Sequence, residues 1–193
     1  MSAREAILAA LKVNRPAGDF PLPDVPSFEE AYREPSKLFP ERLALMGGTM
    51  AALQPGEDWA GLVRRLYPDV RLVCSTVPEV EGTCRITDFA TPQEAQYVEL
   101  GIVRAAFGVA ETGSVCLTEA QLGMNAFPHL CEHLLVLLDP AQVLPNIHSA
   151  YRRPEIARAR YAVLHSGPSA TADIQGVMVR GAQGVRSLTV IYV

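Results

Sequence analysis

The segment Tyr161-Ala-Val-Leu-His165-Ser-Gly-Pro-Ser169-Ala-Thr171-Ala-Asp173 decides how the fold of this chain is interpreted. Its apolar first half predicts a strand, and the Gly-Pro pair predicts a tight turn directly after it. Ser169 or Thr171 then supplies the side chain that caps a helix start. A helix start after such a turn presents free backbone N–H groups, which bind anions. The segment therefore predicts a strand, a turn and a helix, with an anion-binding loop between them.

The loop after this strand admits two interpretations. In the functional one, Gly167 allows the tight turn while Ser169 and Thr171 hold a phosphate or carboxylate through hydroxyl and N–H donors. Asp173 would repel an anion, so it orients the loop or a cation instead. In the structural one, the same residues form only a capped helix start. His165, at the strand end, is either a hydrogen-bond partner of the ligand or a structural histidine.

A second loop of similar chemistry lies upstream, between two apolar runs, at Ala110-Glu111-Thr112-Gly113-Ser114. Ligands of parallel α/β proteins bind outside the carboxyl ends of strands, and both loops follow predicted strands. We therefore expect both loops to border one cleft, with Thr112, Gly113 and Ser114 among its ligand-binding residues. Glu111 is the candidate catalytic residue, as a nucleophile or a proton shuttle. The alternative is that Glu111 braces the loop by accepting backbone N–H bonds.

Apolar runs and helical patterns alternate along the rest of the chain. Strands are expected at 70–74, 98–102, 107–110, 114–117, 133–138, 161–164 and 188–193. Helices are expected at 38–46, after Asp58, at 92–97, and from Asp139-Pro140 through Tyr151. Continuously apolar strands that are separated by helices predict a mostly parallel sheet covered on both faces. The fold class is therefore α/β, with three layers in the order α/β/α.

The first 35 residues are expected to stand apart from a single α/β domain at 36–193. Ser2 and Glu5 form a capping box for a short helix, and Ser27 and Glu30 repeat that pattern. Between them the prolines of residues 16–26 exclude a regular helix or a central strand, which predicts an extended arm. This arm packs either on the body of the protein or on a neighbouring subunit, so a homo-oligomer is possible.

Composition excludes several classes of protein. The net charge is −4 and the pI is near 5.6, whereas nucleic-acid binders usually carry a strong basic excess. The longest apolar run, 134–138, is far shorter than the ~20 residues of a membrane span, and Arg4 and Glu5 interrupt any signal peptide. We therefore expect a cytoplasmic protein.

Cysteines and histidines give no metal site in the sequence. The four cysteines lack C-x-x-C spacing, which predicts buried thiols rather than a zinc or iron–sulfur site in this chain. His129 and His133 lie four residues apart, but two imidazoles without a third ligand are weak evidence for zinc.

Taken together, these motifs resemble the lactate-utilisation (LUD-domain) family, and within it the stand-alone protein C type. The matching residues are 110–114, Pro128, 166–169 with 171–174, and the closing strand 186–191. The resemblance implies the α/β/α fold of the sugar-phosphate isomerase and CoA-transferase group. The family commonly has Gly-x-His-Gly-Pro at 181–185, where this chain has Gln183 and Val185, so a titrating imidazole is lost there. Arg186 matches, and it either holds a carboxylate or braces the loop.

The resemblance also implies a function. It points to a cluster-free subunit of a cytoplasmic, iron–sulfur-dependent lactate-oxidising system, with a small carboxylate or anion site. The partners would be iron–sulfur oxidoreductase subunits that hold the clusters, and this chain would need no cofactor of its own. Two alternatives stay open. One is a stand-alone CoA-transferase-like or isomerase-like enzyme that uses Glu111, and the other is a non-catalytic ligand-sensing module.

Overall fold

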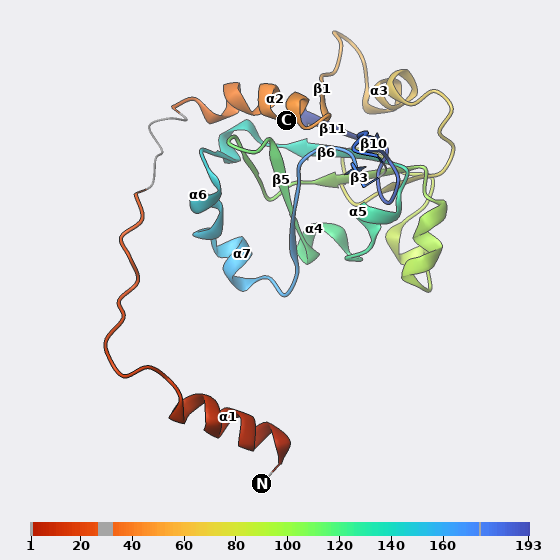
Figure 1. The fold of residues 1–193 in the computed structure, drawn as a ribbon. Helices are drawn as coiled ribbons and strands as arrows, with labels where there is room; N and C mark the ends of the chain where they lie inside the picture. Colours follow the sequence, from red (N-terminus) through yellow and green to blue (C-terminus); the bar gives the residue numbers. More distant parts are fainter. Residues whose placement is uncertain (1, 27–32, 174) are drawn as a thin grey trace.

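The computed structural model describes residues 2–26, 33–173 and 175–193. The second capping box, at Ser27 and Glu30, lies outside these residues. Figure 1 shows one body of helices and strands, with a single helix, α1, held away from it by an extended segment.

A parallel sheet forms the centre of the body. Among the described residues it has five strands, all parallel, in the order β1–β11–β6–β3–β2. Their bounds are Thr49–Ala51, Ser187–Tyr192, His133–Leu138, Leu100–Arg104 and Val73–Ser75. The prediction of an α/β fold with a mostly parallel central sheet, flanked by helices, is confirmed.

The strands of the central sheet are buried on both faces. In β6, Leu134 and Val136 belong to one hydrophobic cluster, while Leu135 and Leu137 belong to another on the opposite face. Side chains alternate between the faces of a strand, so a continuous apolar run such as that of β6 needs cover on both sides. This is why the run was recognisable as a central strand.

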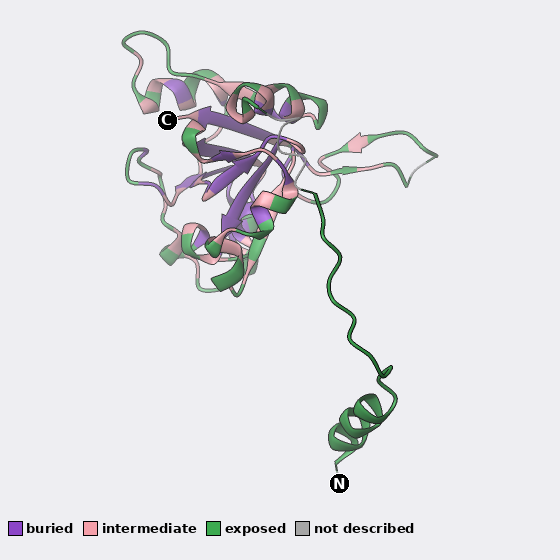
Figure 2. Cartoon of the chain, turned by 90° about the vertical axis from the view of Figure 1, so that its left-hand side faces the viewer, coloured by how far each residue is buried: buried purple, intermediate pink, exposed green. Residues whose placement is uncertain are grey.

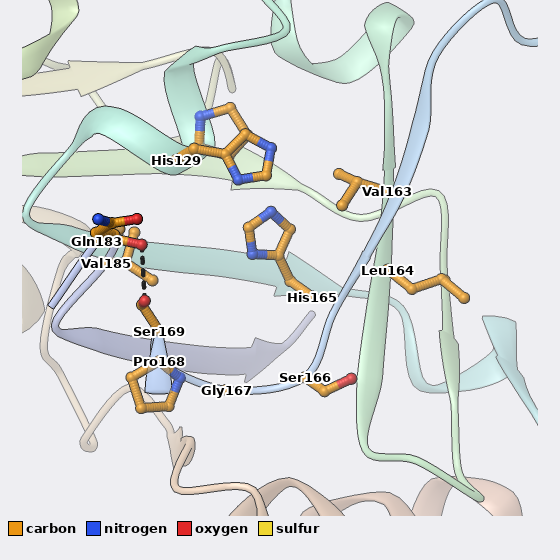
Figure 3. A pocket seen from close by; sticks show the side chains of 12 residues that line it. His129, Val163, Leu164, His165, Ser166, Gly167, Pro168, Ser169, Gln183 and Val185 are labelled. Carbon is orange, nitrogen blue, oxygen red and sulfur yellow. Dashed lines mark hydrogen bonds between the residues drawn. The ribbon is translucent and has the colours of Figure 1, made fainter. Parts of the chain in front are cut away.

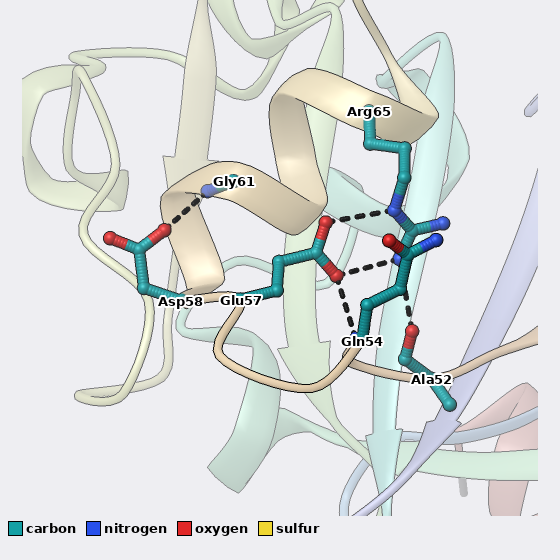
Figure 4. Close-up of polar contacts among 6 residues, drawn as sticks. All are labelled: Ala52, Gln54, Glu57, Asp58, Gly61 and Arg65. Atoms are coloured by element: carbon teal, nitrogen blue, oxygen red, sulfur yellow. Dashed lines mark hydrogen bonds and ion pairs between the residues drawn. The ribbon is translucent and has the colours of Figure 1, made fainter.

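Helix α3 (Trp59–Leu66) covers one of these faces with Leu62. Its start is well fixed: Asp58 Oδ1 accepts a hydrogen bond from Gly61 N at 2.6 Å (Figure 4). Arg65 also returns to Glu57, with Nε donating to Oε1 at 2.8 Å. The predicted helix after Asp58 is therefore confirmed together with its cap.

The other face of the central sheet is covered by several elements. Helices α2 (Pro35–Leu45), α4 (Glu119–Leu122) and α5 (Phe127–Leu130) contribute Phe39, Leu122 and Phe127 to the cluster there. A second sheet contributes Val115 and Leu117. The expected helix at Pro92 is a 3₁₀ helix, η3 (Pro92–Tyr97), and a shorter one, η2, spans Ile86–Asp88.

The second sheet takes three strands that were expected in the central one. In the described chain it has four strands in the order β7–β4–β5–β8, with bounds Val143–Leu144, Phe107–Val109, Ser114–Thr118 and Ala162–His165. Strand β5 runs antiparallel to both β4 and β8. Helices α6 (Ile147–Tyr151) and α7 (Pro154–Arg158) lie on its outer face, where Phe107 and Cys116 are buried.

The helix predicted from Asp139 through Tyr151 is wrong in its middle. Asp139 does cap a turn, η4 (Pro140–Gln142), but the chain then forms β7, which pairs in parallel with β4. Pro145 explains the break, because it lacks an N–H and disfavours the helical conformation at the residue before it. Helix α6 begins only after it, with Asn146 as its N-cap.

The helix predicted after the Gly-Pro turn is also wrong. Strand β9 (Ala170–Thr171) follows the turn and pairs antiparallel with β10 (Val179–Arg180). Ser169 Oγ donates to the carbonyl oxygen of Gln183 at 2.7 Å instead of accepting an N–H from a helix start. Pairing with a later segment thus outweighs the local capping signal. Figure 2 shows the resulting hairpin extending from the body.

The N-terminal segment makes no core of its own. Helix α1 (Ala3–Val13) has the predicted capping box, since Ser2 and Glu5 exchange hydrogen bonds. Every described residue from 2 to 26 is exposed (Figure 2). None of the described helices combines the length and apolar character needed to cross a membrane.

Candidate functional site

The two predicted loops meet at one edge of the second sheet. Strands β4 and β8 run in the same direction, since both are antiparallel to β5, so their carboxyl ends share an edge. Ser114 and Ser166 are joined there by a hydrogen bond between their hydroxyls. Thr112 Oγ1 lies 2.6 Å from Ser114 Oγ and extends this chain of hydroxyls. The loops therefore contact each other directly.

Helix α2 and the turn after it cover this edge. A Cβ on Gly113 would lie 2.3 Å from Leu43 N, and a Cβ on Gly167 would lie 2.4 Å from Met46 O. Both glycines also have positive φ, at +61° and +104°. Only glycine combines that backbone conformation with so close an approach. Glycine at these positions thus lets both loops pack against one helix, which closes the space between them.

Glu111 holds the start of α6. Its carboxylate oxygen Oε2 accepts a hydrogen bond from Ile147 N at 2.9 Å, and its own N–H donates to Pro145 O at 3.1 Å. The side chain is half-buried. These contacts match the bracing alternative, and a catalytic role of Glu111 stays a prediction.

A cavity of about 300 Å³ lies where β8 ends (Figure 3). Three segments line it: the end of β8 with the Gly-Pro loop, helix α5, and the segment that leads into β11. The lining residues are Pro128, His129, Val163, Leu164, His165, Ser166, Gly167, Pro168, Ser169, Gln183, Gly184 and Val185. His165, Gly167 and Ser169 were predicted from the sequence. The cavity lining includes none of the predicted residues of the other loop, Glu111, Thr112, Gly113 and Ser114. Only one of the two predicted loops therefore borders this cavity.

Two stacked imidazoles form one wall of the cavity. The rings of His129 and His165 lie 4.9 Å apart between centroids, with 28° between their planes. His129 Nε2 also lies 2.7 Å from the hydroxyl of Tyr161. His165 Nε2 is buried and has no hydrogen-bond partner among the described residues. A buried polar atom without a hydrogen bond destabilises the folded state by about 1–3 kcal/mol. The unpaired Nε2 of His165 therefore needs a structural or functional explanation.

Both imidazoles are biased toward the neutral state. Burial and, as the smaller cause, the adjacent His129 together lower the pKa of His165 to about 4. Partial burial also lowers the pKa of His129. Both rings are therefore neutral near pH 7, when each offers one donor and one acceptor.

A neighbouring hollow of about 400 Å³ contains the rest of the Gly-Pro segment. It is lined by Thr171 and Asp173, and it shares Ser169 and Gln183 with the cavity. Asp173 is exposed, and its N–H donates to Thr171 Oγ1 at 3.3 Å. Asp173 is thus an open carboxylate at a rim, apart from the two imidazoles.

Arg186 and His133 lie away from the cavity lining. Arg186 forms an ion pair with Glu132 just before the first residues of β11 and β6, and 67% of its side chain is exposed. His133 Nδ1 lies 2.8 Å from Ser187 Oγ, which joins β6 to β11. Among the described residues, no three His, Cys, Asp or Glu side chains gather as a metal-binding group.

Sequence reasoning missed Pro128 and His129 as members of this cavity. His129 drew attention only as a possible partner of His133, four residues later. Its actual neighbour, His165, is 36 residues away, and α5 brings the two rings together through tertiary packing. The departures at Gln183 and Val185 were the sequence signals that pointed to the segment before β11, and both residues line the cavity.

The cysteines are free thiols, and Cys74, Cys116 and Cys131 are buried. Burial raises the pKa of Cys74 and of Cys131 to about 12, and that of Cys116 to about 11. These three thiols are therefore protonated at neutral pH, and a protonated, buried thiol is a poor nucleophile.

Comparisons with known proteins agree with this fold. Residues 87–193, more than half of the chain, match the family model described as the LUD domain. The chain is 28% identical over 97 residues to the uncharacterized protein YkgG of Escherichia coli (strain K12), which covers 47% of this chain and 42% of that protein. A crystal structure of a DUF162 family protein from Deinococcus radiodurans superposes with a TM-score of 0.62 at 16% identity, over 83% of this chain and 97% of that one. The chain belongs to the LUD-domain family.

Proposed function

We propose that this protein is a cluster-free subunit of a cytoplasmic, iron–sulfur-dependent lactate-oxidising system, and that it binds a small carboxylate in the cavity beside His165. The observation that carries the proposal is membership of the lactate-utilisation family over residues 87–193. Iron–sulfur oxidoreductase subunits would be its partners, and they would carry the redox chemistry.

The thiols of this chain support a cluster-free role. Iron–sulfur clusters are held by Cys thiolates. The raised pKa values of Cys74, Cys116 and Cys131 keep these side chains protonated at neutral pH. Clusters would therefore belong to the partner subunits.

The cavity supports a ligand of the size of lactate. About 300 Å³ is at the small end of the range for ligand pockets, and its lining combines apolar side chains with a few polar groups. Ser169, Gln183 and the two imidazoles provide hydrogen-bonding groups on three sides of the cavity. A hydroxy-carboxylate offers both the acceptors and the hydroxyl that such groups recognise.

Lactate-dependent dye reduction tests the proposal. The purified chain is assayed alone and then mixed with candidate iron–sulfur oxidoreductase subunits, and those subunits are also assayed without it. Activity that needs both components supports the subunit function. Turnover by the isolated chain would contradict it, and so would full activity of the partners without this chain.

A further inference from the structure

The lining of the cavity leaves a bound carboxylate without a fixed positive charge. None of the described residues that line it is Arg or Lys. Arg186, the nearest arginine in sequence, is directed to Glu132. Burying an isolated carboxylate is costly unless it is paired with a cation or neutralised. An anion that enters this cavity therefore needs a positive charge that the free protein does not carry there.

His165 is the group best placed to acquire that charge. It lines the cavity, and Figure 3 shows its ring between His129 and the Ser169 end of the loop, with one nitrogen turned toward Ser169 and Gln183. The other ring nitrogen, Nε2, is buried and has no hydrogen-bond partner among the described residues. A neutral ring in this position has hydrogen-bonding capacity left for a ligand.

The titratable groups that face His165 are few. From α5, His129 stacks on it, and His129 is in turn hydrogen-bonded to the hydroxyl of Tyr161. From the adjacent strand β5, Val115 pairs with it. The segment before β11 brings Gln183, Gly184 and Val185, which do not titrate near neutral pH. Two imidazoles this close cannot both be charged at low cost, so the pair takes up one proton at most.

We propose that the cavity binds a small monocarboxylate together with one proton, and that His165 holds this proton against the bound anion. The proposal rests on the carboxylate site proposed above and adds how its charge is neutralised. Inside the cavity the negative carboxylate and the positive imidazolium of His165 form a pair with no net charge. The ligand itself stays an anion and does not bind as the neutral acid.

Linkage fixes the pH dependence. The pKa of free His165 is lowered to about 4 by burial, and a bound anion raises it. Between these two pKa values each bound ligand takes up one proton. The dissociation constant therefore increases by about tenfold for each pH unit in that interval, and it levels off above the pKa of the complex.

The test compares L-lactate with lactamide, its neutral amide analogue, on the full chain. Calorimetry in buffers of different ionisation enthalpy counts the protons taken up for each bound ligand, and imidazole proton NMR follows the histidines. The sequence has four histidines, so the spectrum is simple, and His165→Gln assigns one resonance. We expect about one proton per bound lactate at a pH that lies between the pKa of free His165 and the pKa of the complex. We also expect the His165 resonance to move to its imidazolium position, and lactamide to bind without proton uptake.

Two variants separate His165 from its neighbour. His165→Gln keeps hydrogen bonding but cannot titrate, so the proton uptake and the pH dependence should disappear. His129→Phe keeps an aromatic ring against His165, and uptake should persist. The folded state of each variant is checked by its amide spectrum.

Each result has a distinct meaning. If lactate binds with no proton uptake, this inference is wrong while the carboxylate site stands. If uptake survives His165→Gln and is lost in His129→Phe, His165 is not the proton acceptor and the inference is overturned. If lactate fails to bind the wild-type chain between about pH 5 and pH 8, both the inference and the proposed site are wrong, because the anion and the uncharged ring coexist over that range.

Discussion

Single residues decide whether the Gly-Pro loop can exist. Gly167 holds a φ of +104° and lies so close to α2 that any Cβ would meet Met46 O at 2.4 Å. An L-residue pays for the left-handed conformation and must also displace a backbone oxygen. The cavity depends on this position because the loop from Ser166 to Ser169 forms its floor.

Gly167→Ala should therefore destabilise the fold by about 2 kcal/mol or more, which combines conformational strain with the clash. Gly56→Ala is the matched control, since Gly56 has a φ of +78° and open space around its Cβ position. The control should lose only about 1 kcal/mol. Urea unfolding measures both. Equal losses in the two variants would show that the contact with α2 is unimportant.

Glu111 gives a second prediction at this scale. The carboxylate of Glu111 accepts the N–H of Ile147. The amide oxygen of glutamine can still accept this N–H, so Glu111→Gln loses only the negative charge and should lower the free energy of unfolding by less than about 1 kcal/mol. Lactate-dependent dye reduction by the reconstituted mixture should be retained. If the isolated wild-type chain has turnover that Glu111→Gln abolishes, the catalytic alternative is correct.

At the scale of elements, structure that depends on adjacent residues was predicted correctly from the sequence, whereas structure that depends on long-range pairing was not. The capping box of α1 and the Asp58 cap of α3 were recognisable because a few adjacent residues create them. The apolar run of β6 was recognisable because a strand buried on both faces has no polar positions. Hairpin β9–β10 was not recognisable, because it depends on Thr171 pairing with Val179.

The same distinction applies to the candidate site. Glycines, hydroxyls and His165 at a strand end could be selected from the sequence, since strand ends in α/β proteins bind ligands. The division of the strands between two sheets could not be predicted from the sequence, because parallel and antiparallel strands have similar apolar runs. His129 joins the site only through the position of α5.

The ion pair between Glu57 and Arg65 at the start of α3 predicts that the stability of the fold depends on pH. The hydrogen bonds from Arg65 are the main cause that lowers the pKa of Glu57 to about 2, from an ordinary value of 4.5 (Figure 4). A lowered carboxyl pKa stabilises the fold above the unfolded value, and this stabilisation is lost as the pH falls. Glu57→Gln should thus destabilise the protein at neutral pH, and its deficit should narrow from pH 4.5 down to about 2.

Urea midpoints across that range measure the effect. Arg65→Lys serves as the control, because lysine keeps the charge but loses the two-point contact with the carboxylate. Its deficit at neutral pH should be smaller than that of Glu57→Gln. A Glu57→Gln deficit that does not change with pH would exclude the ion pair as its cause.

Helix α1 carries an apolar face that the described part of the chain leaves exposed. Ile7, Leu8 and Leu11 are 61%, 45% and 64% exposed. Such a face favours contact with another protein surface, and we propose a second copy of this chain. The double change Leu8→Lys with Leu11→Lys should abolish self-association in sedimentation velocity and leave the thermal midpoint of the body unchanged.

Ala6→Lys with Ala9→Lys is the matched control, since these positions lie on the opposite side of the helix. This control should associate like the wild-type chain. A wild-type chain that sediments as a monomer at all concentrations would contradict the proposed self-association.

At the scale of the whole molecule, the cavity lies where the two sheets come together. Strand β8 of the second sheet supplies one wall, and the segment leading into β11 of the central sheet supplies another. Helix α5 closes a third side with His129. The fold of this chain thus brings three distant segments to one place, and the proposed function depends on that place being a ligand site.

Blocking the cavity in the reconstituted system tests this most directly. Gln183 is exposed and lines the cavity, whereas Ala182 next to it is exposed and lines only the neighbouring hollow. Lactate-dependent dye reduction is measured with Gln183→Trp and with Ala182→Trp, after each is shown to bind the partner subunits. We expect Gln183→Trp to lose most of the activity and Ala182→Trp to keep it. Full activity with Gln183→Trp would contradict the proposed ligand site.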